Sequence, residues 1–91
     1  MTDYSLTEAA INDLSQISRY TIENWGPRQA NAYIEKTFET FEMLSRFPAL
    51  ASRADEYFNG RVFFHKHHFI VFRETENGIE ILRILHERMN R

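Results

Sequence analysis

The 91-residue chain contains no cysteine, only three glycines and only two prolines. Without cysteine it can form neither a disulfide framework nor a thiolate metal site, which is compatible with a reducing cytoplasm. No run approaches the roughly 20 apolar residues that a membrane-spanning helix needs. The first residues, MTDYSLTEAAINDL, lack the basic and apolar regions of a signal peptide. These absences predict one soluble, cytoplasmic domain over residues 1–91, without a membrane partner.

Charge is unevenly distributed along the chain. The net charge is −2, and residues 1–56 are acidic in balance, whereas residues 57–91 are slightly basic and hold all four histidines. A basic excess of this size is too small to indicate nucleic-acid binding by itself. We therefore expect an ordinary solvated surface and no direct, specific nucleic-acid binding.

Two amphipathic helices are predicted in the first half of the chain. Ser5 or Thr7 can cap the first helix, whose apolar stripe follows at helical steps: Ala10, Leu14, Ile17, Thr21 and Trp25. Gly26 and Pro27 end that helix and begin the next. The second stripe comprises Ala30, Ile34, Phe38, Phe41, Leu44 and Phe47, with Thr37 at its edge. Pro48 closes this helix, so the short break at Gly26-Pro27 predicts an antiparallel helical hairpin.

The remaining segments predict β-structure and one loop. Residues 4–6, YSL, read as a short edge strand, and residues 48–60 read as a connecting loop. Asn77-Gly78 is a strong signal for a type I′ hairpin turn, because both residues tolerate positive φ. Residues 79 to about 87 are therefore predicted to form a strand that pairs with the strand before the turn. RVFFH, at residues 61–65, is predicted to add a third, antiparallel strand.

A two-residue turn at Asn77-Gly78 sets a register in which Phe72 opposes Arg83 and Phe69 opposes His86. One face then carries Ile70, Phe72, Ile79, Ile81 and Leu85, with His68, Glu74, Arg83 and Glu87. The other face carries Phe69, Val71, Leu82 and Ile84, with Arg73, Thr75, Glu80 and His86. Both faces are substantially apolar, yet one helical hairpin covers only one of them. An uncovered patch on the order of several hundred Å² is unusual for a soluble monomer, so we expect a partner segment, a second copy or the loop at 48–60 to cover it.

Ionisable side chains raise two chemical possibilities, a metal site and a site for RNA cleavage. The histidines could bind a metal, but His65 and His67 would share a strand face while His68 points away, so no metal site is expected. A phosphate-binding, acid–base site for RNA cleavage would use Arg61, His68, Arg73, Arg83, His86 and Arg88. In the predicted register His86 lies on one face of the sheet, whereas His68 and Arg83 lie on the other, so these residues are not expected to converge. We retain the six as candidate target contacts and expect Arg83 to pair with Glu74 or to extend into solvent.

Other signals for chemistry are few. Trp25, at the end of the first helical stripe, is either a core anchor, which is the commoner role, or an interface residue. The chain has no nucleophile elbow, P-loop or dinucleotide fingerprint. We therefore predict no catalytic residue and no cofactor.

Four pieces of the chain resemble a known family: LTEAAINDLSQI, YTIENWGPRQANAY, HFIVFR and IEILRILHERMN. In order and spacing they are similar to ParE-type toxins of bacterial type II toxin–antitoxin systems, within the ParE/RelE superfamily. The resemblance covers nearly the whole chain, and WG..QA..Y and RILH..M are its most specific parts. The segment GRVFFHKHH departs from the pattern, with His and Lys where the family usually has Gly.

The resemblance implies an α+β fold with βααβββ order, in which the helical hairpin packs on one face of a small antiparallel sheet. It also implies a ParD-like antitoxin that covers apolar surface, for which the candidate residues are Trp25, Phe69, Val71, Leu82 and Ile84. The opposite face remains an alternative, because the sequence does not say which face the helices cover. A homodimer and a toxin–antitoxin hetero-oligomer both stay open.

The resemblance further implies a target. ParE-type toxins poison DNA gyrase by binding it, whereas their RelE relatives cut mRNA on the ribosome with a cluster of Lys, Arg and Tyr. Lys36 and Lys66 are the only lysines here, which favours growth inhibition through gyrase. The alternatives are a ribosome-dependent mRNA endoribonuclease and an inactive, toxin-like binding module.

Overall fold

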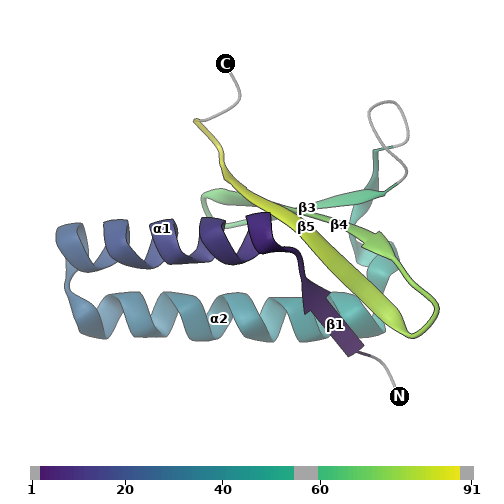
Figure 1. Cartoon of the computed structure of the whole chain (residues 1–91), viewed down its shortest axis with the longest axis horizontal. Helices are drawn as coiled ribbons and strands as arrows, with labels where there is room; N and C mark the ends of the chain where they lie inside the picture. The colour runs from purple at the N-terminus through teal and green to yellow at the C-terminus, as the bar shows by residue number, and fades with distance from the viewer. Residues whose placement is uncertain (1–2, 55–59, 89–91) are drawn as a thin grey trace.

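The computed structural model of the chain describes residues 3–54 and 60–88. Its elements are β1 (Asp3–Leu6), α1 (Glu8–Trp25), α2 (Pro27–Arg46), the 3-10 turn η1 (Pro48–Leu50), β2 (Ser52–Arg53), β3 (Arg61–His65), β4 (His68–Glu74) and β5 (Gly78–His86). The strands form one sheet in the order β1-β5-β4-β3-β2, and the α1–α2 hairpin packs on one of its faces (Figure 1). The α+β class and the βααβββ order are confirmed, with β2 added in a segment predicted as loop.

Both helices begin and end close to the predicted positions. The Thr7 hydroxyl caps α1 by accepting a hydrogen bond from the Ala10 amide at 3.1 Å, whereas Ser5, the rival cap, lies in β1. Gly26 reverses the chain after α1 with a φ of 89°, a conformation that glycine adopts without a Cβ clash. Pro27 then fits the first turn of α2, where its missing amide would have no partner in any case. The helical hairpin is therefore specified by local sequence.

The resemblance implies an antiparallel sheet, but the sheet is mixed, because β1 pairs in parallel with β5. The pairing runs from Asp3–Gly78 to Leu6–Ile81. A Cβ atom on Gly78 would lie 1.7 Å from the carbonyl oxygen of Asp3, so only glycine permits this approach of the two backbones. The N-terminal strand thus reaches the sheet at a position that the sequence keeps free of a side chain.

The β4–β5 turn lies one residue earlier than predicted. The Thr75 amide donates to the Gly78 carbonyl at 2.8 Å, which leaves Glu76 and Asn77 as the two turn residues. Among the residues that the structure describes, only Gly26 and Lys66 have positive φ. The predicted type I′ turn at Asn77-Gly78 is therefore wrong, and Gly78 serves the approach of β1 instead.

A β-bulge in β5 changes which side chains share a face. The ladder passes from Phe72–Ile81 to Val71–Arg83, so Leu82 has no counterpart on β4. Beyond this point Ile70 opposes Ile84, Phe69 opposes Leu85 and His68 opposes His86. One extra residue inverts the alternation that follows it. The predicted faces were therefore wrong for Ile84 and His86, which share the face covered by the helices, and for Leu85, which lies on the other.

The hydrophobic core lies between the hairpin and the inner face of the sheet. Its side chains are at most 4% exposed and comprise Ala10, Phe41, Leu44, Ala51, Ile70, Phe72, Ile79, Ile81 and Ile84. Thr37 is also buried, with its hydroxyl donating to the Tyr33 carbonyl at 2.8 Å, whereas Phe38 of the predicted stripe is 38% exposed. The buried side of α2 is thus turned slightly from the predicted one. In the described part of the chain, neither helix is long and apolar enough to cross a membrane.

Candidate functional site

The face of the sheet that points away from the hairpin carries a patch of apolar side chains. The register puts Phe64 beside Phe69, and Phe69 beside Leu85. Alternation along β4 and β5 adds Val71 and Leu82 to this side. We call these five residues the outer sheet face. Phe64 is 49% exposed, its ring centroid lies 4.9 Å from that of Phe69, and the other four are half-buried.

Charged side chains at the turn end of the sheet are paired within the chain. Arg73 donates from Nε to Glu80 at 2.7 Å, next to the outer sheet face. Arg61 donates from Nε to Glu74 at 2.9 Å and from Nη1 to the Ala51 carbonyl at 2.9 Å. Exposed pairs of this kind add little to stability. The pair of Arg73 with Glu80 does place a neutral ion pair beside the apolar patch.

The Asp13 carboxylate joins α1 to β5 beside the bulge. Arg83 donates to its two oxygens from Nε at 2.8 Å and from Nη2 at 3.0 Å, and the Ile84 amide donates at 2.9 Å. This forked geometry is among the strong forms of hydrogen bonding, and the hydrogen bonds that Arg83 donates to Asp13 raise the pKa of Arg83. The expectation that Arg83 pairs with Glu74 or extends into solvent is wrong, since Arg83 is held by Asp13.

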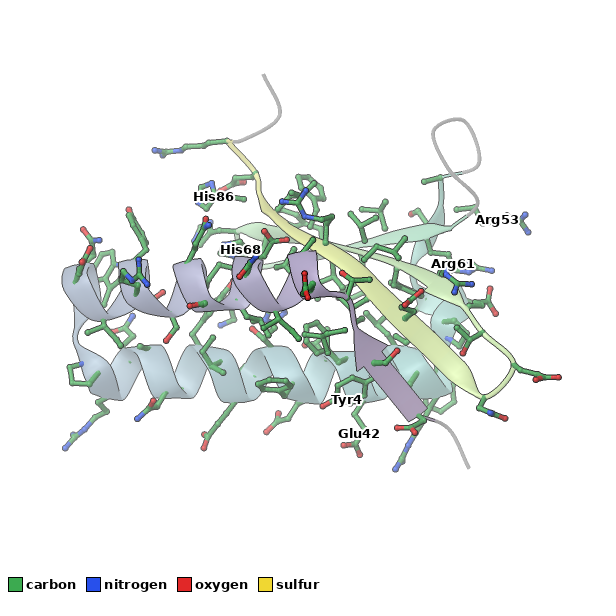
Figure 2. The ribbon with its side chains drawn as sticks, viewed as in Figure 1. Tyr4, Glu42, Arg53, Arg61, His68 and His86 are labelled. Carbon is green, nitrogen blue, oxygen red and sulfur yellow. The ribbon has the colours of Figure 1, made fainter. Side chains whose placement is uncertain are left out.

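Histidine and tyrosine rings meet at the end of the sheet away from the β4–β5 turn. The Tyr33 hydroxyl lies 2.5 Å from Nδ1 of His68. The His68 ring meets the His86 ring edge-on, with 5.1 Å between centroids, and Figure 2 shows these two histidines at the far side of the sheet from Arg61. His67 stacks against His86 at 6.4 Å. The sequence register had placed His68 and His86 on opposite faces, and the bulge brings them together.

Burial sets the protonation of this cluster. It lowers the pKa of His68 to about 4, with the charge of His86 as the next contribution. It also raises the pKa of Tyr33 to about 12 and lowers the pKa of His65. His68 and Tyr33 are therefore both neutral at pH 7. Among residues 3–54 and 60–88, no three His, Asp or Glu side chains are arranged to hold a metal ion.

A groove of about 680 Å³ lies between the hairpin and this end of the sheet. The helices line it with the rings of Tyr20, Trp25 and Tyr33, while the β3–β4 turn and the end of β5 line it with Lys66, His67, His68, His86 and Arg88. We call it the hairpin groove. The end of the hairpin where α1 meets α2 extends past the strands (Figure 1), which leaves the groove open. Trp25 is 64% exposed, so its expected role as a core anchor is wrong.

The candidate residues fall into separate places. Of the candidate antitoxin contacts, Phe69, Val71 and Leu82 share the outer sheet face, Ile84 is buried at 3% exposure, and Trp25 stands in the hairpin groove. Of the candidate target contacts, His68, His86 and Arg88 line the groove, whereas Arg61 and Arg73 lie at the turn end of the sheet. Because Asp13 holds Arg83, the group proposed for RNA cleavage does not assemble as a whole.

Sequence reasoning missed several residues that shape these surfaces. Asp13 had a signal, since it lies one turn after Ala10 on an apolar stripe, and a carboxylate there usually needs a buried partner. Tyr33 and Lys66 had none, because their roles depend on three distant segments meeting. Leu85 was assigned to the other face for a third reason, the bulge at Leu82, which an unbroken run of apolar residues does not reveal. Phe64 was missed because no register was predicted for the strand at residues 61–65.

Comparisons with known proteins agree with this architecture. The chain matches the family model described as ParE toxin of type II toxin-antitoxin system, parDE, over residues 4–91. It is 30% identical to Toxin ParE1 of Caulobacter vibrioides, over 99% of this chain and 94% of that protein. It is 34% identical to Toxin ParE of Escherichia coli, over 99% of this chain and 89% of that protein.

A solved structure agrees as well. The chain superposes on one from the chromosomal ParDE toxin–antitoxin system of P. aeruginosa with a TM-score of 0.81 at 25% identity, over 94% of this chain and 96% of that one. The family match, the two relatives and the shared fold lead to the same assignment: this chain belongs to the ParE toxin family of type II toxin–antitoxin systems.

Proposed function

We propose that this protein inhibits growth by binding and poisoning DNA gyrase in the cytoplasm, and that a ParD-like antitoxin neutralises it by covering the outer sheet face. Membership in the ParE toxin family supports the role of toxin. The structural neighbour comes from a ParDE toxin–antitoxin system, which supports a ParD-like partner. The observation that carries the antitoxin contact is the outer sheet face itself, where apolar side chains lie on the side of the sheet away from the hairpin.

The outer sheet face has the composition of a protein-binding patch. Interface centres are depleted in charge and enriched in aromatic side chains, with a polar rim around them. Here Phe69 lies centrally, between Phe64 and Leu85, and the ion pair of Arg73 with Glu80 lies at the edge. Burying such an aromatic anchor supplies much of the binding energy in known interfaces. We therefore assign Phe69 as the central antitoxin contact.

Action by binding also fits the state of the ionisable groups. A ribonuclease needs a cation and acid–base groups that converge on the transferring phosphate. Arg83 is engaged by Asp13, and His68 is buried and neutral against Tyr33. These contacts favour the gyrase hypothesis over the ribonuclease one.

A supercoiling assay tests the proposal. Relaxed plasmid is incubated with purified gyrase and ATP, with or without this protein, and the DNA is then released with detergent and protease. We expect loss of supercoiled product and accumulation of linear plasmid, both reversed by a molar excess of the antitoxin encoded beside the toxin gene. Heat-denatured toxin serves as the control.

Two results would contradict the proposal. Normal supercoiling in the presence of a large molar excess of folded protein would exclude gyrase poisoning. Cleavage of ribosome-bound mRNA by the same preparation would support the alternative function, a ribosome-dependent mRNA endoribonuclease.

A further inference from the structure

The hairpin groove is rich in flat rings and poor in aliphatic side chains. Its helical wall presents the rings of Tyr20, Trp25 and Tyr33, whereas its aliphatic lining consists of Ile17 and Ile84. The Trp25 and Tyr20 side chains are 64% and 61% exposed, so their ring faces are accessible. Two side-chain amides, Gln16 and Gln29, stand on the same wall. This wall offers stacking surfaces together with donors and acceptors.

The opposite wall of the groove carries positive charge. Lys66 and Arg88 both line it, together with His67 and His86. Two carboxylates in this region are engaged: Asp13, which lines the groove, accepts from Arg83 at 2.8 and 3.0 Å, and Glu87, next to Arg88 in the chain, lies 2.9 Å from Nδ1 of His67. A chain with a net charge of −2 thus concentrates cations at one side of one groove.

The turn between β3 and β4 sets where the Lys66 side chain lies. His65 pairs with His68, so Lys66 is the first residue of a two-residue hairpin turn, in which a positive φ is expected. Its φ is 59°, and it is the sole residue other than glycine in the described ranges with a positive φ. This left-handed conformation is easy for glycine and costs other residues energy, unless Asn or Asp relieves it. The turn therefore places an exposed lysine at the rim of the groove.

From these features we infer that the hairpin groove binds a nucleoside phosphate, with the base stacked on Trp25 and Tyr20 and the phosphate held by Lys66 and Arg88. Bases stack on aromatic side chains largely without regard to sequence, because every base has a π-face. Phosphate oxygens accept charge-assisted hydrogen bonds from lysine and arginine. A free nucleotide and a single-stranded oligonucleotide share this chemistry.

The groove composition argues against a protein helix as the primary occupant. An amphipathic helix lays its apolar face into a hydrophobic groove. The hairpin groove has apolar surface too, but two isoleucines stand there against three aromatic rings, and two amides and two cations line it beside them. The outer sheet face, with its aliphatic and phenyl surface, is the better match for a protein segment. The two surfaces therefore take ligands of different chemistry, and the nucleotide site does not depend on gyrase as the target.

The sole tryptophan of the chain is a built-in probe, because Trp25 lines the groove. Full-length protein is titrated at low salt with adenosine 5′-monophosphate, adenosine, inorganic phosphate or single-stranded hexaadenylate, and tryptophan emission is recorded. We expect saturable quenching by the monophosphate, about tenfold weaker binding of adenosine, and progressive weakening as salt rises. Tighter binding of hexaadenylate identifies a nucleic-acid strand as the source of the ligand, and equal binding identifies a free nucleotide.

Variants separate the ligand from the fold. Lys66→Gly removes the charge and relieves the left-handed backbone, so the protein should be at least as stable, yet bind the monophosphate about tenfold more weakly. Arg88→Ala should weaken binding similarly, while Lys36→Ala, the matched control on the exposed surface of α2, should leave it unchanged. For Trp25→Ala, calorimetry replaces fluorescence and should show about tenfold weaker binding.

Three results would overturn the inference. One is the absence of saturable binding of either the monophosphate or hexaadenylate at millimolar concentration. Another is unchanged affinity in a folded Lys66→Gly protein. The third is loss of antitoxin binding in Trp25→Ala without any nucleotide binding by the unmodified protein, which would make the groove part of the protein interface.

Discussion

The outer sheet face and the hairpin groove flank the same strand, β5, yet they are built differently. On the outer sheet face, phenyl and aliphatic side chains lie together and the neighbouring Arg73 and Glu80 neutralise each other. In the hairpin groove, exposed rings face Lys66 and Arg88 across a hollow of about 680 Å³. A flat, neutral, apolar surface gains most from excluding water against a second protein. A hollow with rings and cations gains most from a small, anionic ligand.

The bulge at Leu82 produces this difference. Before the bulge, the inward positions of β5 are Ile79 and Ile81, which fill the core. After it, the inward positions are Ile84 and His86, so a histidine reaches the groove while Leu85 joins the outer sheet face. A regular strand would exchange Leu85 and His86 between the two surfaces. Bulges beside functional sites commonly redirect a side chain in this way.

The largest expected effect concerns the binding of the antitoxin to the outer sheet face. Phe69→Ala should weaken antitoxin binding by about 2–4 kcal/mol, as the loss of a central aromatic anchor does in other interfaces. Phe38→Ala is the matched control, because Phe38 is an exposed phenyl ring on α2 that lies outside both surfaces. Calorimetry with the antitoxin measures both, after circular dichroism confirms the fold. Equal losses in the two variants would remove the outer sheet face from the interface.

The next effect concerns the Asp13 carboxylate, which links α1 to β5. Asp13→Ala should lower the free energy of unfolding by about 2–3 kcal/mol, since it leaves the buried Ile84 amide without its acceptor and Arg83 without its partner. Arg83→Ala should cost less, because the Ile84 amide keeps its bond and the Arg83 side chain is 46% exposed. Denaturant unfolding measures both. A larger loss in Arg83→Ala would mean that the ion pair, and not the amide contact, dominates.

Local signals in the sequence were sufficient for the helical hairpin. Thr7, Gly26 with Pro27, and Pro48 mark its boundaries by capping and backbone chemistry that act within a few residues. The positions of β3, β4 and β5 followed from composition in the same way. Gly78 shows the limit of this reasoning, because a glycine next to Asn77 predicts a turn as readily as it predicts the close approach of another strand. The presence of Asp3 beside it is visible only in the fold.

The surfaces were harder to predict than the elements. Which side chains share a face depends on the bulge at Leu82, and no residue in the run from Ile79 to Leu85 marks it. The hairpin groove needs Trp25, Lys66 and Arg88 to meet from three segments, and the net charge of the whole chain conceals the local excess of cations. Sequence periodicity describes each strand alone, whereas a site is a property of the assembled strands and helices.

A smaller effect tests the groove through its pH dependence. The pKa of His68 is about 4 in the folded protein against 6.5 in an ordinary histidine, so the unfolded chain binds the proton first as pH falls. The stabilising contribution of neutral His68 is thus complete above pH 6.5 and declines as pH falls from 6.5 towards 4. Between pH 7.5 and pH 5 the loss should be about 1–2 kcal/mol, after allowance for solvent screening.

The comparison variant is His68→Asn, whose amide can still bond the Tyr33 hydroxyl but does not titrate. Denaturant unfolding at a series of pH values should show a shallower decline for His68→Asn than for the unmodified protein. His65, whose pKa is also lowered by burial, is present in both proteins, so the difference between the two profiles reports chiefly on His68 and its coupling to its neighbours. Parallel pH profiles would mean that His68 is not held neutral by the fold.

The smallest expected effect tests whether Trp25 belongs to the wall of the hairpin groove or to the hydrophobic core. Trp25→Ala should change the free energy of unfolding by no more than about 0.5 kcal/mol. The Trp25 side chain is 64% exposed, and alanine has a higher helix propensity than tryptophan. Phe41→Leu, in the fully buried part of α2, should cost more than about 1 kcal/mol, although it removes fewer atoms. Unfolding followed by circular dichroism compares them without relying on tryptophan emission. If Trp25→Ala were the more damaging change, its ring would serve the fold, and the case for a ligand stacked on it would lose its main support.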